Sequence, residues 1–116
     1  MHFKLIIALT EDSITDKIVD AARTRGATGS TVISSARGEG LEAAKSFLGL
    51  NLATQRDVVM LLVEEHLSRE ILETIEQAGA FEDNPGSGIA FSIDVEDAVG
   101  VSHQVRQLSE RVEEEI

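Results

Sequence analysis

The segment that most constrains the fold runs from Arg25 to Gly40, because a helix end, a strand and a hinge follow one another within it. Gly26 is suited to end a helix, since glycine adopts the left-handed conformation without steric cost. The β-branched stretch Ser30–Ser35 predicts a strand. Gly38 and Gly40 then allow a sharp turn or a close approach of the backbone to a ligand.

The residues after this hinge, Leu41 to Arg56, carry only a weak hydrophobic pattern. A connection of this length is unusual in a small domain, where such loops are functional or disordered. We therefore expect a compact scaffold that displays one large loop. The centre of this loop contains Lys45, Ser46, Phe47 and Leu48. These residues could bind a partner and become ordered on contact, or they could pack back onto the sheet of their own chain, and both alternatives stay open.

Short apolar runs on either side of the loop predict further strands. Phe3–Leu9 and Val58–Val63 are bounded by polar residues, which is typical of buried strands. A fourth strand, Gly88–Ile93, follows the turn-forming residues Asp83–Gly88.

Apolar residues spaced three and four apart predict three helices. The first takes its N-cap from Thr10–Ser13 and ends at Gly26. The second is capped by Ser68 and ends at Gly79. The third covers Gln104–Glu115.

The order of these elements is β-α-β, long loop, β-α-β, followed by a helix. This order predicts an α+β fold, a ferredoxin-like βαββαβ sandwich with a long loop between strands 2 and 3 and a C-terminal helix. The two helices of such a sandwich leave one face of the sheet open. Because Val58–Val63 is apolar on both faces, we expect self-association to cover the open face, with the C-terminal helix adding to the cover.

Composition excludes several classes of function. The 116 residues include 21 acidic and 10 basic ones, a net charge of −11 that disfavours nucleic acid as a partner. The chain has no cysteine and therefore no disulfide or thiolate metal site. No apolar run approaches the roughly 20 residues that span a bilayer, and no secretory signal is evident, so we expect a cytoplasmic protein.

The titratable residues form no catalytic constellation, and we expect the protein not to be an enzyme. Glu64 and Glu65 stand between a strand and a helix, where carboxylates stabilise the helix dipole. The histidines lack the spacing of metal ligands and the paired serines lack a base, which favours surface or capping roles for His2, His66, His103, Ser34 and Ser35.

Two glycine clusters are better candidates for a binding site. Ala36–Gly40 combines backbone N–H groups with the guanidinium of Arg37, a combination suited to a phosphate or carboxylate. Asn84–Gly88 is a second turn of the same potential. Each alone fits a plain turn, but both adjoin strands of one small sheet, and an oligomer could bring them together across an interface.

These segments resemble the PII signal-transduction family, trimeric ferredoxin-like regulators that bind adenine nucleotides in clefts between subunits. The resemblance covers about residues 3 to 101. The family pattern Gly-x-x-Gly-x-Thr-Val is matched by Gly26–Val32, the start of its T-loop by Arg37–Gly40, and its B-loop by Gly86–Phe91. Val95–Val99 resembles the segment that follows the B-loop.

The resemblance implies a domain at residues 1–101, with a T-loop at about 37–56, and a C-terminal helix and acidic tail at 102–116. It implies that Lys45, Ser46, Phe47 and Leu48 belong to the partner-binding loop, and that Arg37 is a phosphate ligand. The nucleotide-binding residues that it implies are Thr31, Arg37, Gly38, Gly40, Leu62, Gly86, Ser87 and Gly88.

Departures from the family pattern bear on the ligand. The B-loop lysine is replaced by Ile89, two arginines fall on Gly100 and Ser102, and a glutamate falls on Met60. The loss of cations implies AMP, ADP or cyclic AMP as the ligand in preference to ATP. The chain has no tyrosine, so tyrosine uridylylation cannot occur. The chain therefore looks like the divergent PII-like branch.

The function implied is a homotrimeric signal-transduction regulator that senses an adenine nucleotide and controls a transporter, channel or enzyme, as in nitrogen regulation. A first alternative is a trimeric interaction protein that has lost nucleotide binding, which the missing cations favour. A second is a metal-binding protein of the divalent-cation-tolerance type, which the lack of cysteine and of clustered histidine disfavours.

Overall fold

The computed structural model describes residues 1–36, 46–47, 50–51 and 56–115. The chain forms β1 (Phe3–Glu11), a single 3-10 turn η1 (Asp12–Ile14), α1 (Thr15–Thr24) and β2 (Thr31–Ala36). A short hairpin, β3 (Ser46–Phe47) and β4 (Leu50–Asn51), follows. The remaining elements are β5 (Arg56–Glu64), α2 (Glu65–Gly79), β6 (Gly88–Val95) and α3 (Ser102–Glu115).

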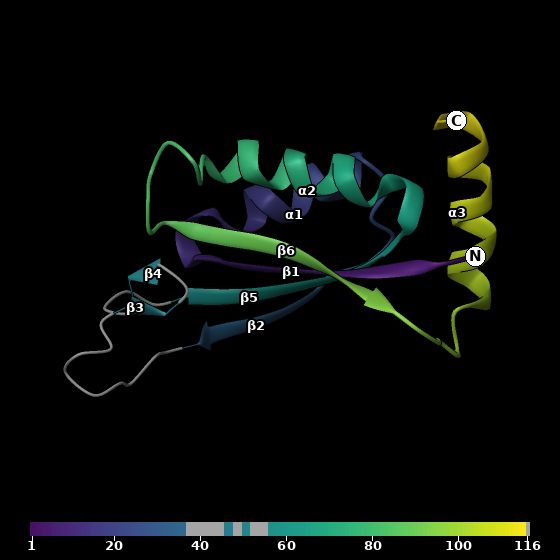
Figure 1. Cartoon of the computed structure of the whole chain (residues 1–116), viewed down its shortest axis with the longest axis horizontal. Helices are drawn as coiled ribbons and strands as arrows, with labels where there is room; N and C mark the ends of the chain where they lie inside the picture. Colours follow the sequence, from purple (N-terminus) through teal and green to yellow (C-terminus); the bar gives the residue numbers. More distant parts are fainter. Residues whose placement is uncertain (37–45, 48–49, 52–55, 116) are drawn as a thin grey trace.

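The main sheet has the strand order β2-β5-β1-β6, and each neighbouring pair is antiparallel. Helices α1 and α2 lie side by side on one face of this sheet (Figure 1). The predicted α+β ferredoxin-like sandwich is therefore confirmed. In the described part of the chain, no helix is long and apolar enough to cross a membrane.

The core lies between the sheet and the two helices. Side chains alternate along a strand, so every second residue of β1 and β5 faces the helices. Ile6, Val59 and Leu61 are at most 1% exposed for this reason. Spacings of three and four turn one face of each helix toward the same layer, where the buried residues include Ile18, Ala22, Leu67, Ile71 and Ile75.

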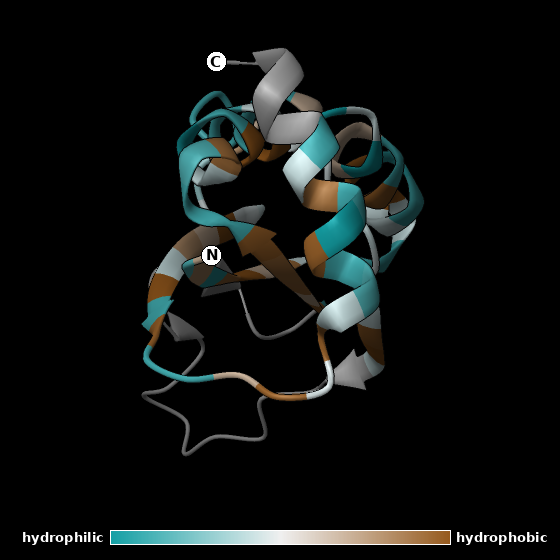
Figure 2. Cartoon of the chain, turned by 90° about the vertical axis from the view of Figure 1, so that its right-hand side faces the viewer, coloured by the Kyte–Doolittle hydropathy of each residue, from teal (hydrophilic) through white to brown (hydrophobic). Residues whose placement is uncertain are grey.

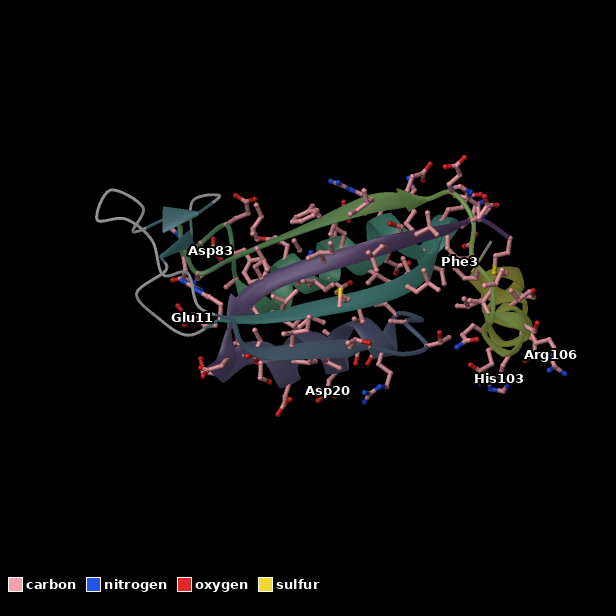
Figure 3. The ribbon with its side chains drawn as sticks, turned by 90° about the horizontal axis from the view of Figure 1, so that it is seen from below. Phe3, Glu11, Asp20, Asp83, His103 and Arg106 are labelled. Atoms are coloured by element: carbon pink, nitrogen blue, oxygen red, sulfur yellow. The ribbon has the colours of Figure 1, made fainter. Side chains whose placement is uncertain are left out.

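The opposite face of the sheet carries apolar side chains without helix cover (Figure 3). Ile33 and Ile93 are 50% and 47% exposed, and six further residues are half-buried. The register places these six on one face of the two central strands: Leu5, Ile7, Leu9, Val58, Met60 and Leu62. The sheet thus has the open apolar face that the sequence predicts.

Helix α3 stands at the end of the sheet beside the N-terminus (Figure 1). Apolar positions interrupt its polar surface (Figure 2), and Leu108, 1% exposed, belongs to the same core cluster as Phe3. Val101 and Val105 pack against that cluster. The helix therefore closes one end of the sandwich.

The helix starts differ from the prediction. Glu64, not Ser68, caps α2: its backbone is extended and its carboxylate accepts a hydrogen bond from the N–H of His66. Ser68 is buried inside the helix. None of the predicted caps in Thr10–Ser13 serves α1, because Thr10 belongs to β1, and the N-cap position of the helix is taken by Ile14 without a side-chain hydrogen bond.

The predicted helix ends are close to the observed ones. Gly26 has a φ of 113°, just beyond the end of α1 at Thr24. Gly79 is the last residue of α2, but the left-handed residue is Ala80, with a φ of 51°. The loop was predicted to reach Arg56, whereas the structure places Arg56 at the start of β5.

Candidate functional site

Asn84–Gly88 forms the turn that leads from α2 into β6, the 84–88 turn. Its backbone is closed by hydrogen bonds from Asn84 N to Ala80 O (3.1 Å) and from Ser87 N to Asn84 O (3.0 Å). The Asn84 side chain donates a further bond to Ala80 O. Gly86 has a φ of 86°, a conformation that favours glycine. The turn is thus a closed backbone structure.

The packing of the Phe81 ring requires glycine at position 88. Phe81 is 8% exposed, and its ring lies against the Cα atoms of both Gly79 and Gly88, so that a Cβ at either position would overlap it. The sequence analysis assigned Gly88 to ligand binding and missed this packing role. Phe81 lies in the same connection, between the end of α2 and the turn, and only the fold shows that its ring packs against Gly88.

Arg56 reaches the turn from the start of β5. Its guanidinium donates hydrogen bonds to Ser87 O and, at 2.8 Å, to Gly86 O. The carboxylate of Glu11 lies 3.8 Å from the guanidinium. Arg56 is 4% exposed, so these partners offset the cost of removing its charge from water. Sequence reasoning placed Arg56 in the loop and did not connect it with the turn.

A second polar contact lies beside this one, on the helix side of the sheet. Thr15 donates a hydrogen bond of 2.7 Å to the buried carboxylate of Asp57. The strand register places Thr10 opposite both Asp57 and Gly88. The hydroxyl oxygens of Thr10 and Ser87 are buried without a hydrogen-bond partner in the described structure. Polar groups therefore gather where β1 ends and β5 and β6 begin.

A shallow groove of about 570 Å³ runs between α2 and β6 and includes two glycines of the turn. Leu72 and Ala90 give it apolar surface, and three carboxylates face one arginine, which is itself paired with Glu73 at 2.9 Å. This charge does not favour a polyphosphate. The lining residues are Arg69, Leu72, Glu73, Glu76, Phe81, Glu82, Gly86, Gly88, Ile89 and Ala90.

The predicted nucleotide-binding residues do not all meet within one chain. Thr31 pairs with Met60 in the strand register, and Leu62 lies two positions along on the same face. Leu5 pairs with Leu62, while Thr10 pairs with Gly88. Five steps from Leu5 to Thr10 separate Leu62 from Gly88 by about 17 Å along the strands, at roughly 3.4 Å per residue. Thr31 lies level with Ile7, about 10 Å along the strands from Gly88 by the same rise per residue, and on the opposite edge strand of the sheet.

The structure brings together three of the predicted residues, Gly86, Ser87 and Gly88, in the turn. Arg37, Gly38, Gly40, Lys45 and Leu48 lie outside the described residues. Ser46 and Phe47 form β3, where only the backbone is described.

The cluster Glu64, Glu65 and His66 brings ligand-type atoms within 4.8 Å of one another. Both oxygens of the Glu64 carboxylate already accept hydrogen bonds, from His66 N at 2.7 Å and from His66 Nδ1 at 2.5 Å. The positive end of the α2 dipole also disfavours a metal cation there. The hydrogen bond and charge of Glu64 raise the pKa of His66. The arrangement is a helix cap, as the sequence indicates for these carboxylates.

The model of one protein family, nitrogen regulatory protein P-II, matches residues 3–105. The chain belongs to the P-II family. No curated protein matches the chain.

Solved structures of PII-like proteins share the fold. A protein described as a PII-like signaling protein, from Thermus thermophilus, is 25% identical, with a TM-score of 0.60 over 82% of this chain and 87% of that one. The protein CPII from Thiomonas intermedia, bound to ADP, AMP and acetate, is 21% identical, with a TM-score of 0.65 over 86% and 92%. Its apo form is also 21% identical, with a TM-score of 0.63 over 82% and 90%.

Three positions at which the P-II family pattern has cations hold Ile89, Gly100 and Ser102 in this chain. Ile89 pairs with Leu9 near the start of β6. Gly100 has a φ of 80°, and Ser102 is the first residue of α3. None of these three side chains carries a charge that could offset that of a phosphate. Arg56 is a described cation that does reach the turn.

Proposed function

We propose that this P-II family member is a signalling regulator that binds an adenine nucleotide between subunits and controls a partner protein through its T-loop. The observation that carries the proposal is the 84–88 turn, held by Arg56 at the end of the sheet to which the T-loop segment connects. The ADP and AMP in the CPII structure support an adenine nucleotide as the ligand. The proposed activity is binding, without a chemical step.

The separation between the two groups of predicted residues supports a site between subunits. Leu62 lies about 17 Å along the strands from Gly88, at roughly 3.4 Å per residue. Thr31 and Gly88 lie on opposite edge strands of the sheet, so one small ligand does not contact both groups within one chain. The open apolar face gives a reason to assemble, since burial of such surface contributes about 25 cal/mol per Å². A homotrimer would cover this face and could pair the turn of one subunit with Thr31 and Leu62 of another.

The charge pattern supports a ligand with few phosphates. Each absent charge-assisted contact withholds about 1.5–3 kcal/mol from the binding of an anion. AMP, ADP and cyclic AMP are therefore proposed ahead of ATP, with Arg37 as a phosphate ligand. A ligand that favours one T-loop state would change the affinity for a partner by the same coupling free energy. A transporter or channel is the proposed partner class, and the cytoplasm is the proposed location.

Isothermal titration with AMP, ADP, ATP and cyclic AMP, each with and without magnesium, tests the ligand. The mass in solution is measured first by light scattering, against a subunit of 12.5 kDa. We expect a trimer and saturable binding near one site per subunit, tightest for AMP, ADP or cyclic AMP.

A trimer that binds none of the four ligands would instead support the alternative of an interaction protein that has lost nucleotide binding. The replacement of the expected cations by Ile89, Gly100 and Ser102 is the observation that favours this alternative. Partner capture with and without added nucleotide separates the two functions, because only the sensor has a nucleotide-dependent set of partners.

A further inference from the structure

The guanidinium of Arg56 contacts the 84–88 turn through its carbonyl oxygens. It donates to the consecutive carbonyls of Gly86 and Ser87, and the carboxylate of Glu11 lies 3.8 Å from it. Glu11 comes from β1, Arg56 from β5, and the two carbonyls from the turn before β6. The contact therefore forms only when the strands have assembled in this register.

The bonds determine which way the peptide groups of the turn face. In a trans peptide the C=O and N–H groups point in opposite directions. Holding the carbonyls of Gly86 and Ser87 against Arg56 therefore directs the N–H groups of Ser87 and Gly88 away from it. The N–H of Ser87 indeed donates to Asn84 O within the turn.

The direction of the carbonyls matters for an anionic ligand. Carbonyl oxygens that face a phosphate repel it, whereas N–H groups attract it. The position of the expected B-loop lysine is Ile89, so no charge from that residue offsets a misplaced carbonyl. Arg56 is 4% exposed, so its guanidinium holds the turn from the buried side and does not stand at the protein surface.

We propose that Arg56 is a positioning residue for the nucleotide site: it draws the Gly86 and Ser87 carbonyls inward and so makes the turn compatible with a phosphate. This inference rests on the proposed function, because it concerns the same turn. Arg56 acts through the turn and is not assigned a contact with the ligand. Its role depends on the paired geometry of a guanidinium, which lysine does not reproduce.

The test compares Arg56→Gln, Arg56→Lys and the control Arg23→Gln. Arg23 lies exposed on α1, paired with Asp20, and its replacement removes the same charge away from the turn. Calorimetry measures ADP affinity, light scattering measures assembly, and NMR measures the amide and carbonyl shifts of Gly86, Ser87 and Gly88.

With assembly retained, we expect Arg56→Gln to weaken ADP binding at least about tenfold, or ~1.4 kcal/mol. Arg56→Lys should restore less than half of this loss in free energy, and Arg23→Gln should bind as the wild type does. Both Arg56 variants should shift the turn resonances. Wild-type affinity in Arg56→Gln, or full restoration by lysine, would overturn the proposal.

Two further outcomes remain decisive. If Arg56→Gln does not fold, the lysine variant carries the test, and unchanged turn resonances together with wild-type ADP affinity would overturn the proposal. If the wild-type protein binds no adenine nucleotide, the proposed function fails by itself. The resonances of the Arg56→Lys variant still show in that case whether the arginine orients the turn.

Discussion

At the scale of single residues, the site depends on the packing of a nearby ring and on one contact that joins distant parts of the chain. The ring of Phe81 lies between the backbones of Gly79 and Gly88, and Arg56 holds two carbonyls that lie 30 and 31 positions further along the chain. Glycine is therefore required at position 88 by the neighbouring ring, a requirement separate from that of the proposed ligand. The two requirements are separable by measurement, because one concerns stability and the other binding.

Gly88→Ala should destabilise the fold, because the new methyl group would overlap the buried ring of Phe81. Overpacking of this kind costs about 1–3 kcal/mol, measured as a lower midpoint of urea unfolding. Gly29→Ala is the matched control, since nothing lies within 4 Å of a Cβ at position 29. Equal stability of the two variants would show that the ring moves aside without cost.

The contact between His66 and Glu64 predicts a dependence of stability on pH. The pKa of His66 is raised from its ordinary value of 6.5, first by the hydrogen bond to Glu64 and then by its charge. A raised folded-state pKa gives stability that is fully present below 6.5 and lost as the pH rises through the folded value.

The measurement is the urea midpoint between about pH 5 and pH 9, the range in which histidine titrates. His66→Gln should flatten the curve over the upper part of this range. His103→Gln, which changes an exposed histidine of α3, should leave the wild-type curve unchanged. Identical curves for the wild type and His66→Gln would rule out this contribution.

At the scale of elements, helix boundaries follow from the residues that satisfy the free N–H groups. Ser68 has the chemistry of a cap, but the strand β5 ends at Glu64 in an extended conformation whose carboxylate already reaches the first turn of α2. The helix therefore begins before Ser68, which becomes one of its buried residues. The acidic residues that sequence analysis assigned to the helix dipole include the cap itself.

Helix α3 should depend on one buried side chain for its docking. Leu108 is 1% exposed and belongs to the core cluster, while the neighbouring Gln107 is exposed. Leu108→Ala should cost about 2–5 kcal/mol, the usual loss on truncating a core leucine. Urea unfolding measures the loss, with Gln107→Ala as the control near wild type. A loss below about 1 kcal/mol would mean that α3 is not docked through Leu108.

At the scale of the whole molecule, the open face of the sheet is the main surface still to be covered. Apolar side chains from β1 and β5 are only half-buried there, and Ile33 and Ile93 stand about half exposed near its two edges. A contiguous apolar face of this kind marks an interaction surface. Self-association is the proposed cover, because the predicted site is incomplete within one chain.

Ile93→Glu should separate the subunits, because it would place a charge in the apolar interface. The side chain is 47% exposed within one subunit, so the subunit itself should remain folded. Light scattering would then give a mass near 12.5 kDa, with an unchanged circular dichroism spectrum. Lys17→Glu on the exposed surface of α1 should stay assembled. A wild-type mass for Ile93→Glu would place the interface elsewhere.

Local patterns in the sequence were sufficient for the order of the four main strands and three α-helices and for the family, but not for η1 or the short strands β3 and β4. The apolar runs around Phe3 and Val58, the helical spacing before Gly26 and the turn before Gly88 each depend on neighbours within a few residues. Such periodicity reflects which face of an element is buried. The motif Gly86–Phe91 could likewise be read without knowledge of the fold, as could the apolar character of both faces of Val58–Val63.

Only the tertiary structure decided how the 84–88 turn is held. The bonds of Arg56 to Gly86 and Ser87, and the packing of Phe81 against Gly88, depend on the register of the strands and on the path of α2 above them. Arg56 meets the turn only after the strands pair, and Phe81 meets Gly88 only once the chain has turned from α2 into β6. The sequence therefore determined which glycines form the turn, and the fold determined which side chains hold it in place.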